Sequence, residues 1–256
     1  SQGVAPRHRV HVPGRIEVLG KHTDYAGGRS LLAAVERGFC AVSAPRPDRV
    51  VRLTDLGRAD EVSLTLDATA VPVTTPHWAI YPGAVVRRLA RDFKSPLRGA
   101  DIAFVSDLPP SSGLSSSSAL LVATFDALRL ANDLDARDDF QRALPGVLDV
   151  AAYLGSVESG RPFRAFRGEA GVGTAGGSQD HTAILASEPG HVRQFGYAPA
   201  RLEGTAALPK DVTFVVGMSG VAAQKTGGAR EAYNRAAARA ATLLEVWRET
   251  TGRADA

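Results

Sequence analysis

The chain has 256 residues, enough for one large domain or two smaller ones with a sizeable core. Hydrophobic residues make up 44% and charged residues 22%, the balance of a soluble globular protein. The formal charge is only +3 and the basic residues are scattered, which argues against nucleic-acid binding and mildly favours anionic ligands such as nucleotides. Cys40 is the only cysteine, which excludes an intrachain disulfide, and no apolar run reaches the roughly eighteen residues of a membrane span. We therefore expect a cytoplasmic protein without a membrane or nucleic-acid partner.

Hydrophobic periodicity predicts the secondary structure in chain order. Strands and helices are mixed rather than strictly alternating, so the expected fold class is α+β and not a doubly wound sheet. The segments 38–44 and 49–54 are expected to pair as antiparallel neighbours. Strands are expected over residues 9–13, 30–35, 38–44, 49–54, 61–66, 100–106, 191–196 and 211–217. Helices are expected over residues 78–92, 116–132, 138–158 and 228–250.

A stretch containing several prolines and glycines, residues 188–210, is the expected domain boundary. Little more than one strand and one long helix follows it, too little for an independent domain. We therefore expect a first domain over residues 1–205 and an incomplete beginning of a second domain over 206–256. The chain is thus expected to be cut short at its C-terminus.

The segment 109–120 (PPSSGLSSSSAL) is the most informative feature of the sequence. Small residues let a backbone approach a ligand closely, and free N–H groups at the positive end of a following helix bind anions. Serine hydroxyls add donors for phosphate oxygens and a ligand for magnesium. A flexible linker is the alternative, but the segment lies between a predicted strand and an uninterrupted helix, where linkers do not occur.

Two further segments carry polar residues among glycines. Residues 13–28 (PGRIEVLGKHTDYAGG) contain Arg15, Lys21, His22 and Asp24, and the Asp24 carboxylate can accept hydrogen bonds from two hydroxyls of a polyol. A solvated turn is the alternative. Residues 171–185 (GVGTAGGSQDHTAIL) place Asp180 after a glycine-rich approach and before an apolar run, so this aspartate is either a rigidly held functional group or an N-cap.

Together the three segments resemble the GHMP small-molecule kinases and, within them, the galactokinases. The family's first motif, Gly-Arg-x-Asn-Leu-Ile-Gly-Glu-His-Thr-Asp-Tyr, is retained here as Gly14, Arg15, Gly20, His22, Thr23, Asp24 and Tyr25. Its second motif, Pro-x-Gly-x-Gly-Leu-Ser-Ser-Ser, is matched by Pro109, Gly113, Leu114, Ser115, Ser116 and Ser117, with Ser111 in place of a glycine. Residues 75–81 (TPHWAIY), 176–180 (GGSQD) and 231–235 (EAYNR) resemble three later motifs.

The resemblance implies an α+β GHMP-kinase fold, with a first domain like domain 2 of ribosomal protein S5 and a second, ferredoxin-like domain. It also implies transfer of a phosphoryl group from ATP to the anomeric hydroxyl of a sugar, with Mg²⁺ as cofactor. Asp180 would orient and deprotonate the hydroxyl, and Arg15 would stabilise the transferring group. Lys21, His22, Asp24 and Tyr233 would face the sugar. The phosphates would lie against Pro109, Ser111, Ser112, Gly113, Leu114, Ser115, Ser116, Ser117 and Ser118.

Three assignments stay open within the resemblance. Trp78 would stack on the adenine, or it is a tryptophan of the core or of an exposed helix. Ser117 would bind magnesium together with a glutamate. Glu169 has the family's spacing to Asp180, but we prefer Glu158 because it lies in the better helical context (YLGSVES, 153–159), in which case residues 160–169 are an insertion.

Two departures from the family concern the first motif. Glu17 replaces the asparagine, which we interpret as a local packing change. Lys21 replaces a glutamate that in galactokinases accepts from the sugar's O6 hydroxyl. A lysine cannot accept a hydrogen bond, so we expect a substrate with an anion at C6, such as a uronic acid, or a pentose without C6. The alternative is that Lys21 turns outward and a neighbouring residue recognises the C6 group of the sugar.

Other functions remain open from sequence alone. One is another GHMP kinase of mevalonate or homoserine type, against which residues 22–25 and the Trp78 segment argue. Another is a galactokinase-like sensor that binds ATP and sugar without turnover, against which the presence of Arg15, Asp180 and the full serine run argues. The partners expected are small molecules, sugar and ATP, and the protein is expected to be a monomer or homodimer.

Overall fold

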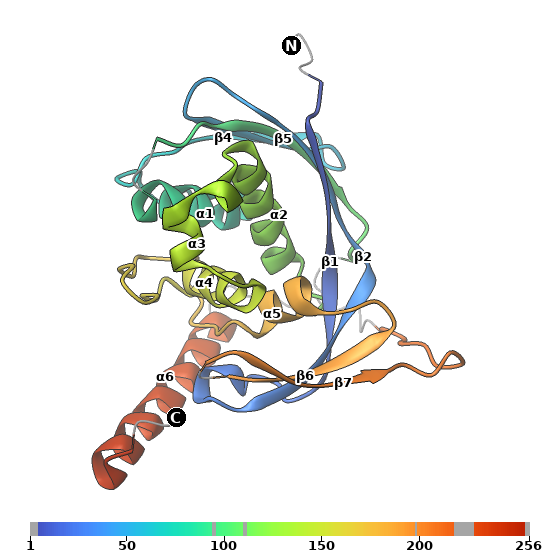
Figure 1. The fold of residues 1–256 in the computed structure, drawn as a ribbon, viewed down its shortest axis with the longest axis vertical. Coiled ribbons are helices and arrows are strands. Elements are labelled where there is room, and N and C mark those ends of the chain that lie inside the picture. The colour runs from blue at the N-terminus through green and yellow to red at the C-terminus, as the bar shows by residue number, and fades with distance from the viewer. Residues whose placement is uncertain (1–4, 94–95, 110–111, 198, 218–227, 254–256) are drawn as a thin grey trace.

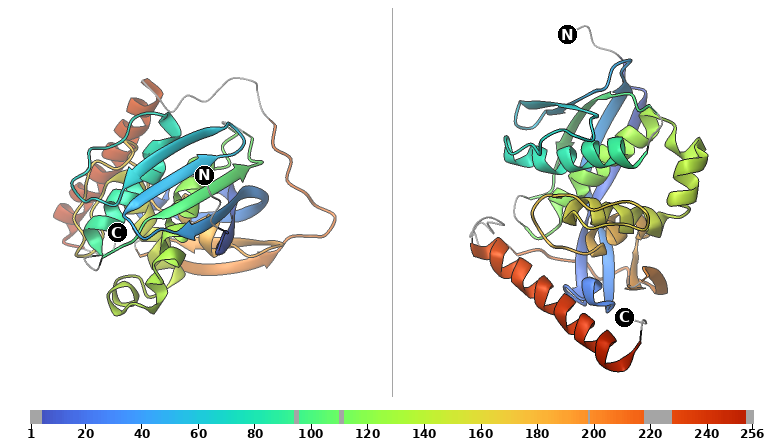
Figure 2. Two further views of the ribbon diagram at one scale, coloured as in Figure 1. Left: turned by 90° about the horizontal axis from the view of Figure 1, so that it is seen from above. Right: turned by 90° about the vertical axis from the view of Figure 1, so that its left-hand side faces the viewer.

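A computed structural model describes residues 5–93, 96–109, 112–197, 199–217 and 228–253. They form one large mixed sheet whose concave face is covered by helices, with a long C-terminal helix crossing its lower end (Figures 1 and 2). The strands are β1 (His8–Leu19), β2 (Arg29–Pro45), β3 (Val50–Asp55), β4 (Asp60–Thr65), β5 (Ala100–Ser106), β6 (His191–Gly196) and β7 (Arg201–Ala207). The α-helices are α1 (Ile80–Asp92), α2 (Ser116–Ala131), α3 (Asp138–Ala143), α4 (Val147–Ser159), α5 (Gln179–Ala186) and α6 (Gly228–Thr251), and single 3₁₀ turns occupy Asp24–Ala26, His77–Ala79 and Leu134–Ala136.

Strand β2 organises the sheet. It pairs with β1 along one edge, while on its other edge its second half pairs with β5 and its first half with β6. The strand order is β4-β3-β5-β2-β6-β7, and β3 runs parallel to β5 while the other pairs are antiparallel. A mixed sheet with its helices on one face confirms the α+β class that the sequence predicted.

The core lies between this sheet and helices α1, α2 and α4. Alternate side chains of β5 face the core, and these are Ala100, Ile102 and Phe104, which are buried. Helix α2 presents Leu121 and Phe125 to them, both with no exposed surface. Burying each such side chain stabilises the fold by about 1.5–3 kcal/mol. The sheet and α2 therefore form a rigid support for the segment that precedes α2.

The helix predictions have two errors: one predicted helix is divided, and α5 (Gln179–Ala186) was not predicted. Helices α1, α2 and α6 lie where the sequence predicted them, but the segment 138–158 divides into α3 and α4. The break follows from Pro145, because a proline forces the preceding residue out of the helical region, and Leu144 has φ −133° and ψ 66°.

The strand predictions contain four errors. Segments 30–35 and 38–44 are parts of one strand, β2, and β5 lies between β2 and β3, which are therefore not neighbours. Residues 211–217 are not a strand. Strand β7 was missed because it is largely exposed and polar, and its pairing with β6 alone defines it. No helix within the described residues is both long and apolar enough to span a membrane.

Candidate active site

A cavity of about 780 Å³ opens where the end of β1 meets the starts of α2 and α5. Segments more than 150 residues apart in sequence meet there, since Arg15 on β1 contacts Asp180 on α5. The lining includes most side chains that the sequence analysis selected. These are Arg15, Lys21, His22, Asp24, Ser112, Gly113, Leu114, Ser115, Ser118, Glu158, Asp180 and Tyr233.

Asp180 is the most heavily bonded residue of the cavity. Arg15 donates to its Oδ1 from Nε at 2.8 Å, and Arg15 Nη2 lies 2.7 Å from the same oxygen. Ser115 Oγ donates to Oδ2 at 2.6 Å. Arg15 also donates from Nη1 to the Gly113 carbonyl at 2.6 Å, so one guanidinium ties β1, the segment before α2 and α5 together. Charge-assisted bonds of this kind hold both side chains in one geometry.

These contacts set the ionisation of Asp180. Burial acts to raise its pKa, but the charge of Arg15 and the hydrogen bonds from Ser115 and Arg15 outweigh burial and lower the pKa to about 2. The carboxylate is therefore ionised at neutral pH. A carboxylate with so low a pKa is a weak base, so its main capacity is to accept a hydrogen bond and orient the donor.

Asp24 forms a second acidic group on the same side of the cavity. The backbone N–H of Gln179 donates to its Oδ2 at 2.9 Å. Burial raises the pKa of Asp24, and the nearby charge of Asp180 raises it further, while the hydrogen bond from Gln179 opposes both. A Cβ at Gly177 would lie 2.0 Å from Asp24 Oδ2, so only glycine leaves room for this carboxylate.

Glu17 lines the cavity next to these groups, which the sequence analysis did not expect. The side chain of Gln179, only 4% exposed, donates from Nε2 to Glu17 Oε2 at 2.6 Å. The same Gln179 holds Asp24 through its backbone, so it fixes two carboxylates at once. Glu17 is therefore part of the polar lining and more than the packing change that its replacement of an asparagine suggested.

Helix α6 contributes Tyr233 to the cavity lining. The ring of Tyr233 packs edge-on against His22, with centroids 5.1 Å apart. Asn234 accepts from the Ala175 N–H at 2.9 Å and donates to the Gly173 carbonyl at 3.0 Å. Helix α6 is thereby attached to the glycine-rich segment that leads to Asp180.

The start of α2 is built to face an anion. Ser115 adopts a left-handed conformation (φ 59°) at the N-cap position, and its hydroxyl binds Asp180 rather than capping the helix. No other described side chain caps this end, so N–H groups of the first turn are free for a ligand at the positive end of the helix dipole. Ser112 Oγ donates to the Pro109 carbonyl at 2.8 Å and closes the preceding turn.

Glu158, and not Glu169, reaches the cavity. The end of α4 lies against the segment before α5, where a Cβ at Gly155 would lie 2.8 Å from the Ser178 Cα. This close approach brings Glu158 to Ser118, whose Oγ donates to Glu158 Oε2 at 2.9 Å. Glu169 instead lies 3.5 Å from Arg87 and 3.8 Å from Arg91 and is outside the lining.

Other predicted site residues lie outside the cavity lining. Trp78 donates from Nε1 to Asp60 Oδ2 at 2.8 Å and packs edge-on against Phe104, so it is held at the edge of the core. Ser117 interacts with Tyr81 of α1, whereas its neighbour Ser118 binds Glu158. Pro109 and Ser116 are described but do not line the cavity, and Ser111 lies outside the described residues. The ATP and metal roles assigned to these residues stay predictions.

Comparison with known proteins agrees with this geometry. Residues 2–45 match the galactokinase galactose-binding signature and residues 81–161 match the GHMP kinases N terminal domain. The chain is 31% identical over 260 residues to a galactokinase of Chloroflexus aggregans, covering 99% of the chain and 59% of that protein. It is 36% identical over 133 residues to a galactokinase of Roseiflexus, covering 52% of the chain and 33% of that protein.

The chain is similar to galactokinases, and residues 81–161 match a domain of the GHMP kinases. Its fold is theirs. A galactokinase of Lactococcus lactis complexed with galactose superposes with a TM-score of 0.62 at 21% identity, over 78% of this chain and 46% of that one. A mevalonate kinase of Methanococcus jannaschii superposes with a TM-score of 0.55 at 17% identity, over 77% and 56% of the two chains. The chain spans 59% of the length of the Chloroflexus relative.

GHMP kinases use a nucleotide with a divalent cation, and the cavity contains donors that suit one. Glu158, Asp180 and the Ser118 hydroxyl are hard oxygen ligands of the kind that Mg²⁺ prefers. The described residues contain no cluster of three or more histidine, cysteine, aspartate or glutamate side chains that could hold a metal ion alone. Mg²⁺ is commonly held through one or two carboxylates together with the phosphates of a nucleotide.

Several residues that line the cavity were not predicted from the sequence. Gln179 and His181 flank Asp180, and Gly177 precedes it closely, so proximity to the motif was the available signal. Residues 214–217, expected to form a strand, line the cavity without regular structure. Thr174 and Gly176 complete the set missed on the approach to α5.

Proposed function

We propose that the protein transfers the terminal phosphoryl group of ATP to the anomeric hydroxyl of galactose or a related sugar. The observation that carries the proposal is the pairing of Asp180 with Arg15 in the cavity that also contains the start of α2. Phosphoryl transfer depends mainly on positioning and on stabilisation of charge. An ionised aspartate, a fixed guanidinium and a free helix N-terminus in one cavity meet both needs.

In this mechanism, Asp180 accepts a hydrogen bond from the anomeric hydroxyl and aligns its oxygen with the terminal phosphorus. The low pKa means that Asp180 takes the proton late, as the new O–P bond forms and the bond from phosphorus to the bridging oxygen of ATP breaks. Arg15 provides positive charge next to the transferring group, and ADP leaves with the electron pair of the broken bond.

The sugar would lie at the β1 end of the cavity. Asp24 accepts from ring hydroxyls, and His22 and Tyr233 form a wall through their ring contact. The phosphates would lie against the segment from Pro109 to Ser118, with Trp78 on the adenine side. Glu158 and a serine of the run (Ser117 as first assigned, or Ser118, which reaches Glu158) would hold Mg²⁺, which when bound neutralises phosphate charge.

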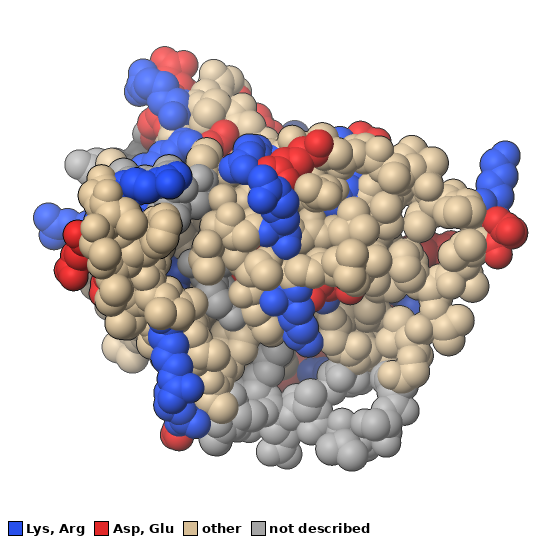
Figure 3. Space-filling view, turned by 90° about the horizontal axis from the view of Figure 1, so that it is seen from below, with Lys and Arg blue, Asp and Glu red and all other residues tan. Residues whose placement is uncertain are grey.

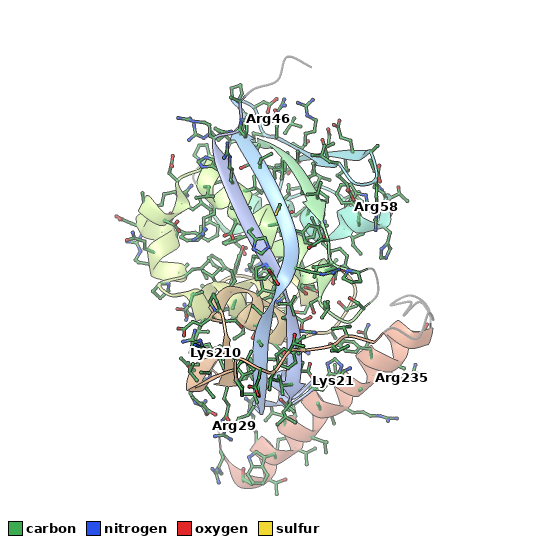
Figure 4. The ribbon with its side chains drawn as sticks, turned by 90° about the vertical axis from the view of Figure 1, so that its right-hand side faces the viewer. Lys21, Arg29, Arg46, Arg58, Lys210 and Arg235 are labelled. Carbon is green, nitrogen blue, oxygen red and sulfur yellow. The ribbon has the colours of Figure 1, made fainter. Side chains whose placement is uncertain are left out.

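We infer the class of sugar from the charge of Lys21. It is exposed, lines the cavity and makes no ion pair with any described residue, and Figure 4 shows it at the end of the long strands beside α6. A cation here favours a carboxylate at C6 of the substrate. The proposed substrates are accordingly a uronic acid of galactose configuration or a pentose, alongside galactose itself.

The protein is expected to release ADP when a sugar is added, in a coupled assay with ATP and Mg²⁺. Galactose, galacturonate, a pentose, mevalonate and homoserine form the panel, and Asp180→Asn is the matched inactive control. Release of ADP with a sugar, lost in Asp180→Asn, supports the proposal. Turnover of mevalonate or homoserine alone would make it wrong, and sugar binding without ADP release would identify a sensor.

A further inference from the structure

His181 follows Asp180 on α5 and lines the cavity, although only 1% of the residue is exposed. Neither Nδ1 nor Nε2 of its ring has a hydrogen-bond partner within the described residues. A buried polar group without a partner is costly, and such groups are rare in folded proteins. A histidine retained there for packing alone would be poorly matched to its surroundings.

One charged group lies against this ring. His181 Nε2 is 3.1 Å from Glu158 Oε2, close enough for an ion pair, but the N–H direction misses the oxygen and no hydrogen bond forms. Ser118 donates to the same oxygen at 2.9 Å. Two groups thus meet at Oε2, whereas none of the described residues donates a hydrogen bond to Oε1 of Glu158.

Asp180 and Glu158, two of the carboxylates that line the cavity, are therefore held differently. Both oxygens of Asp180 are occupied, Oδ1 by Arg15 and Oδ2 by Ser115. Glu158 is held by one oxygen only, and no described basic side chain except His181 pairs with it. A carboxylate fixed at one oxygen is oriented to bind a cation through the other.

We propose that His181 is a positioning residue for Glu158: together with Ser118 it holds Oε2, so that Oε1 is presented to the divalent cation that accompanies the nucleotide. This inference rests on the proposed function for the identity of the ligand. A small rotation of the Glu158 carboxylate aligns Oε2 with the Nε2–H of His181, so binding through Oε1 and the hydrogen bond to His181 reinforce each other. Partners of this kind, which orient metal ligands, change metal affinity when they are removed.

The test measures cation binding and not turnover. Mn²⁺ is titrated into the chain with ADP, and free Mn²⁺ is followed by electron paramagnetic resonance. In His181→Leu the dissociation constant of Mn²⁺ is expected to rise about tenfold. In His181→Gln, whose amide N–H can replace Nε2–H, most of the affinity should return. Ser118→Ala, a small change at the same oxygen, should weaken Mn²⁺ binding by a similar factor.

Thr182→Val is the matched control, because Thr182 is the next residue of α5 and is equally buried but does not contact Glu158. It should leave Mn²⁺ affinity unchanged. Unchanged affinity in both His181→Leu and Ser118→Ala would overturn the inference, as would equal losses in His181→Leu and Thr182→Val or no Mn²⁺ binding by the unaltered chain. These outcomes are separate from failure of the proposed function, which is the absence of sugar-dependent ADP release.

Discussion

Asp24 and Gly177 approach each other so closely that a Cβ at position 177 would lie 2.0 Å from Asp24 Oδ2. The Asp24 carboxylate cannot move away freely, because the backbone N–H of Gln179 donates to the same oxygen at 2.9 Å. The glycine-rich approach to α5 and the motif around Asp24 are therefore complementary surfaces, although 153 residues of sequence separate positions 24 and 177.

Gly177→Ala is expected to displace Asp24 and to weaken sugar binding by about 10- to 100-fold, since a hydrogen bond to a charged group contributes about 1.5–3 kcal/mol. Nucleotide affinity should change little, because the start of α2 is not disturbed. Calorimetric titration with sugar and with ADP separates the two effects. Gly204→Ala is the control, since a Cβ there meets no atom within 4 Å. Equal sugar affinity in the two variants would contradict the prediction.

The pairing of Asp180 with Arg15 predicts a specific acid sensitivity. The pKa of Asp180 is about 2 in the folded chain against an ordinary value of 3.8, so the unfolded state takes up this proton first as the pH falls. The stabilisation is complete above the ordinary value and is lost as the pH falls towards 2.

Between about pH 5 and pH 2, the free energy of unfolding should therefore decrease by about 2 kcal/mol more in the unaltered chain than in Asp180→Asn. Urea unfolding at a series of pH values measures the difference. The contributions of carboxylates that both proteins share cancel in it. Parallel pH profiles for the two proteins would show that Asp180 is not the group responsible.

Glu158 and Glu169 should behave oppositely when each is changed to glutamine. Glu158→Gln removes the carboxylate that faces the cavity and should weaken nucleotide-dependent Mn²⁺ binding strongly with little change in stability. Glu169→Gln leaves the buried Arg87 without its anion and should lower the free energy of unfolding by about 3 kcal/mol, with Mn²⁺ affinity unchanged. The same Mn²⁺ titration and a urea curve distinguish them, and the reverse pattern would assign the cation to Glu169.

The sequence was sufficient for the α+β class and for most helices, because apolar periodicity depends on local residues alone. It was also sufficient to select Arg15, Asp24 and Asp180, which lie within motifs whose residue types suggest their chemistry and which all line the cavity. Their roles stay predictions. Strand order could not be obtained in this way. Nothing in residues 38–54 indicates that β5, about fifty residues later, inserts between β2 and β3.

The side chains that support the site were hidden for a related reason. His181 lies against Glu158, and Gln179 binds Glu17. These partners are far away in sequence and meet only because α4 and β1 pack against α5. Similarly, the sequence does not distinguish Ser117 from its neighbour Ser118. The helical turn decides that one faces Tyr81 and the other Glu158.

Lys21 is the side chain that we propose to determine the choice of sugar. Among the described residues on the face in Figure 3, basic and acidic side chains are interspersed rather than gathered into one broad basic patch. Lys21→Glu restores the acceptor that the galactokinase motif places at this position. It should raise kcat/KM for galactose about tenfold or more, since a hydrogen bond to a charged group contributes about 1.5–3 kcal/mol.

The same change should lower kcat/KM for galacturonate, because two carboxylates would then face each other. Lys210→Glu is the matched control: it makes the same charge change at an exposed lysine outside the cavity lining (Figure 4). Steady-state kinetics with both sugars gives the ratio of the two specificity constants for each variant. If Lys21→Glu and Lys210→Glu shift this ratio equally, the preference comes from the overall charge of the protein, and Lys21 does not read C6. A shift confined to Lys21→Glu places the C6 group of the substrate next to this side chain.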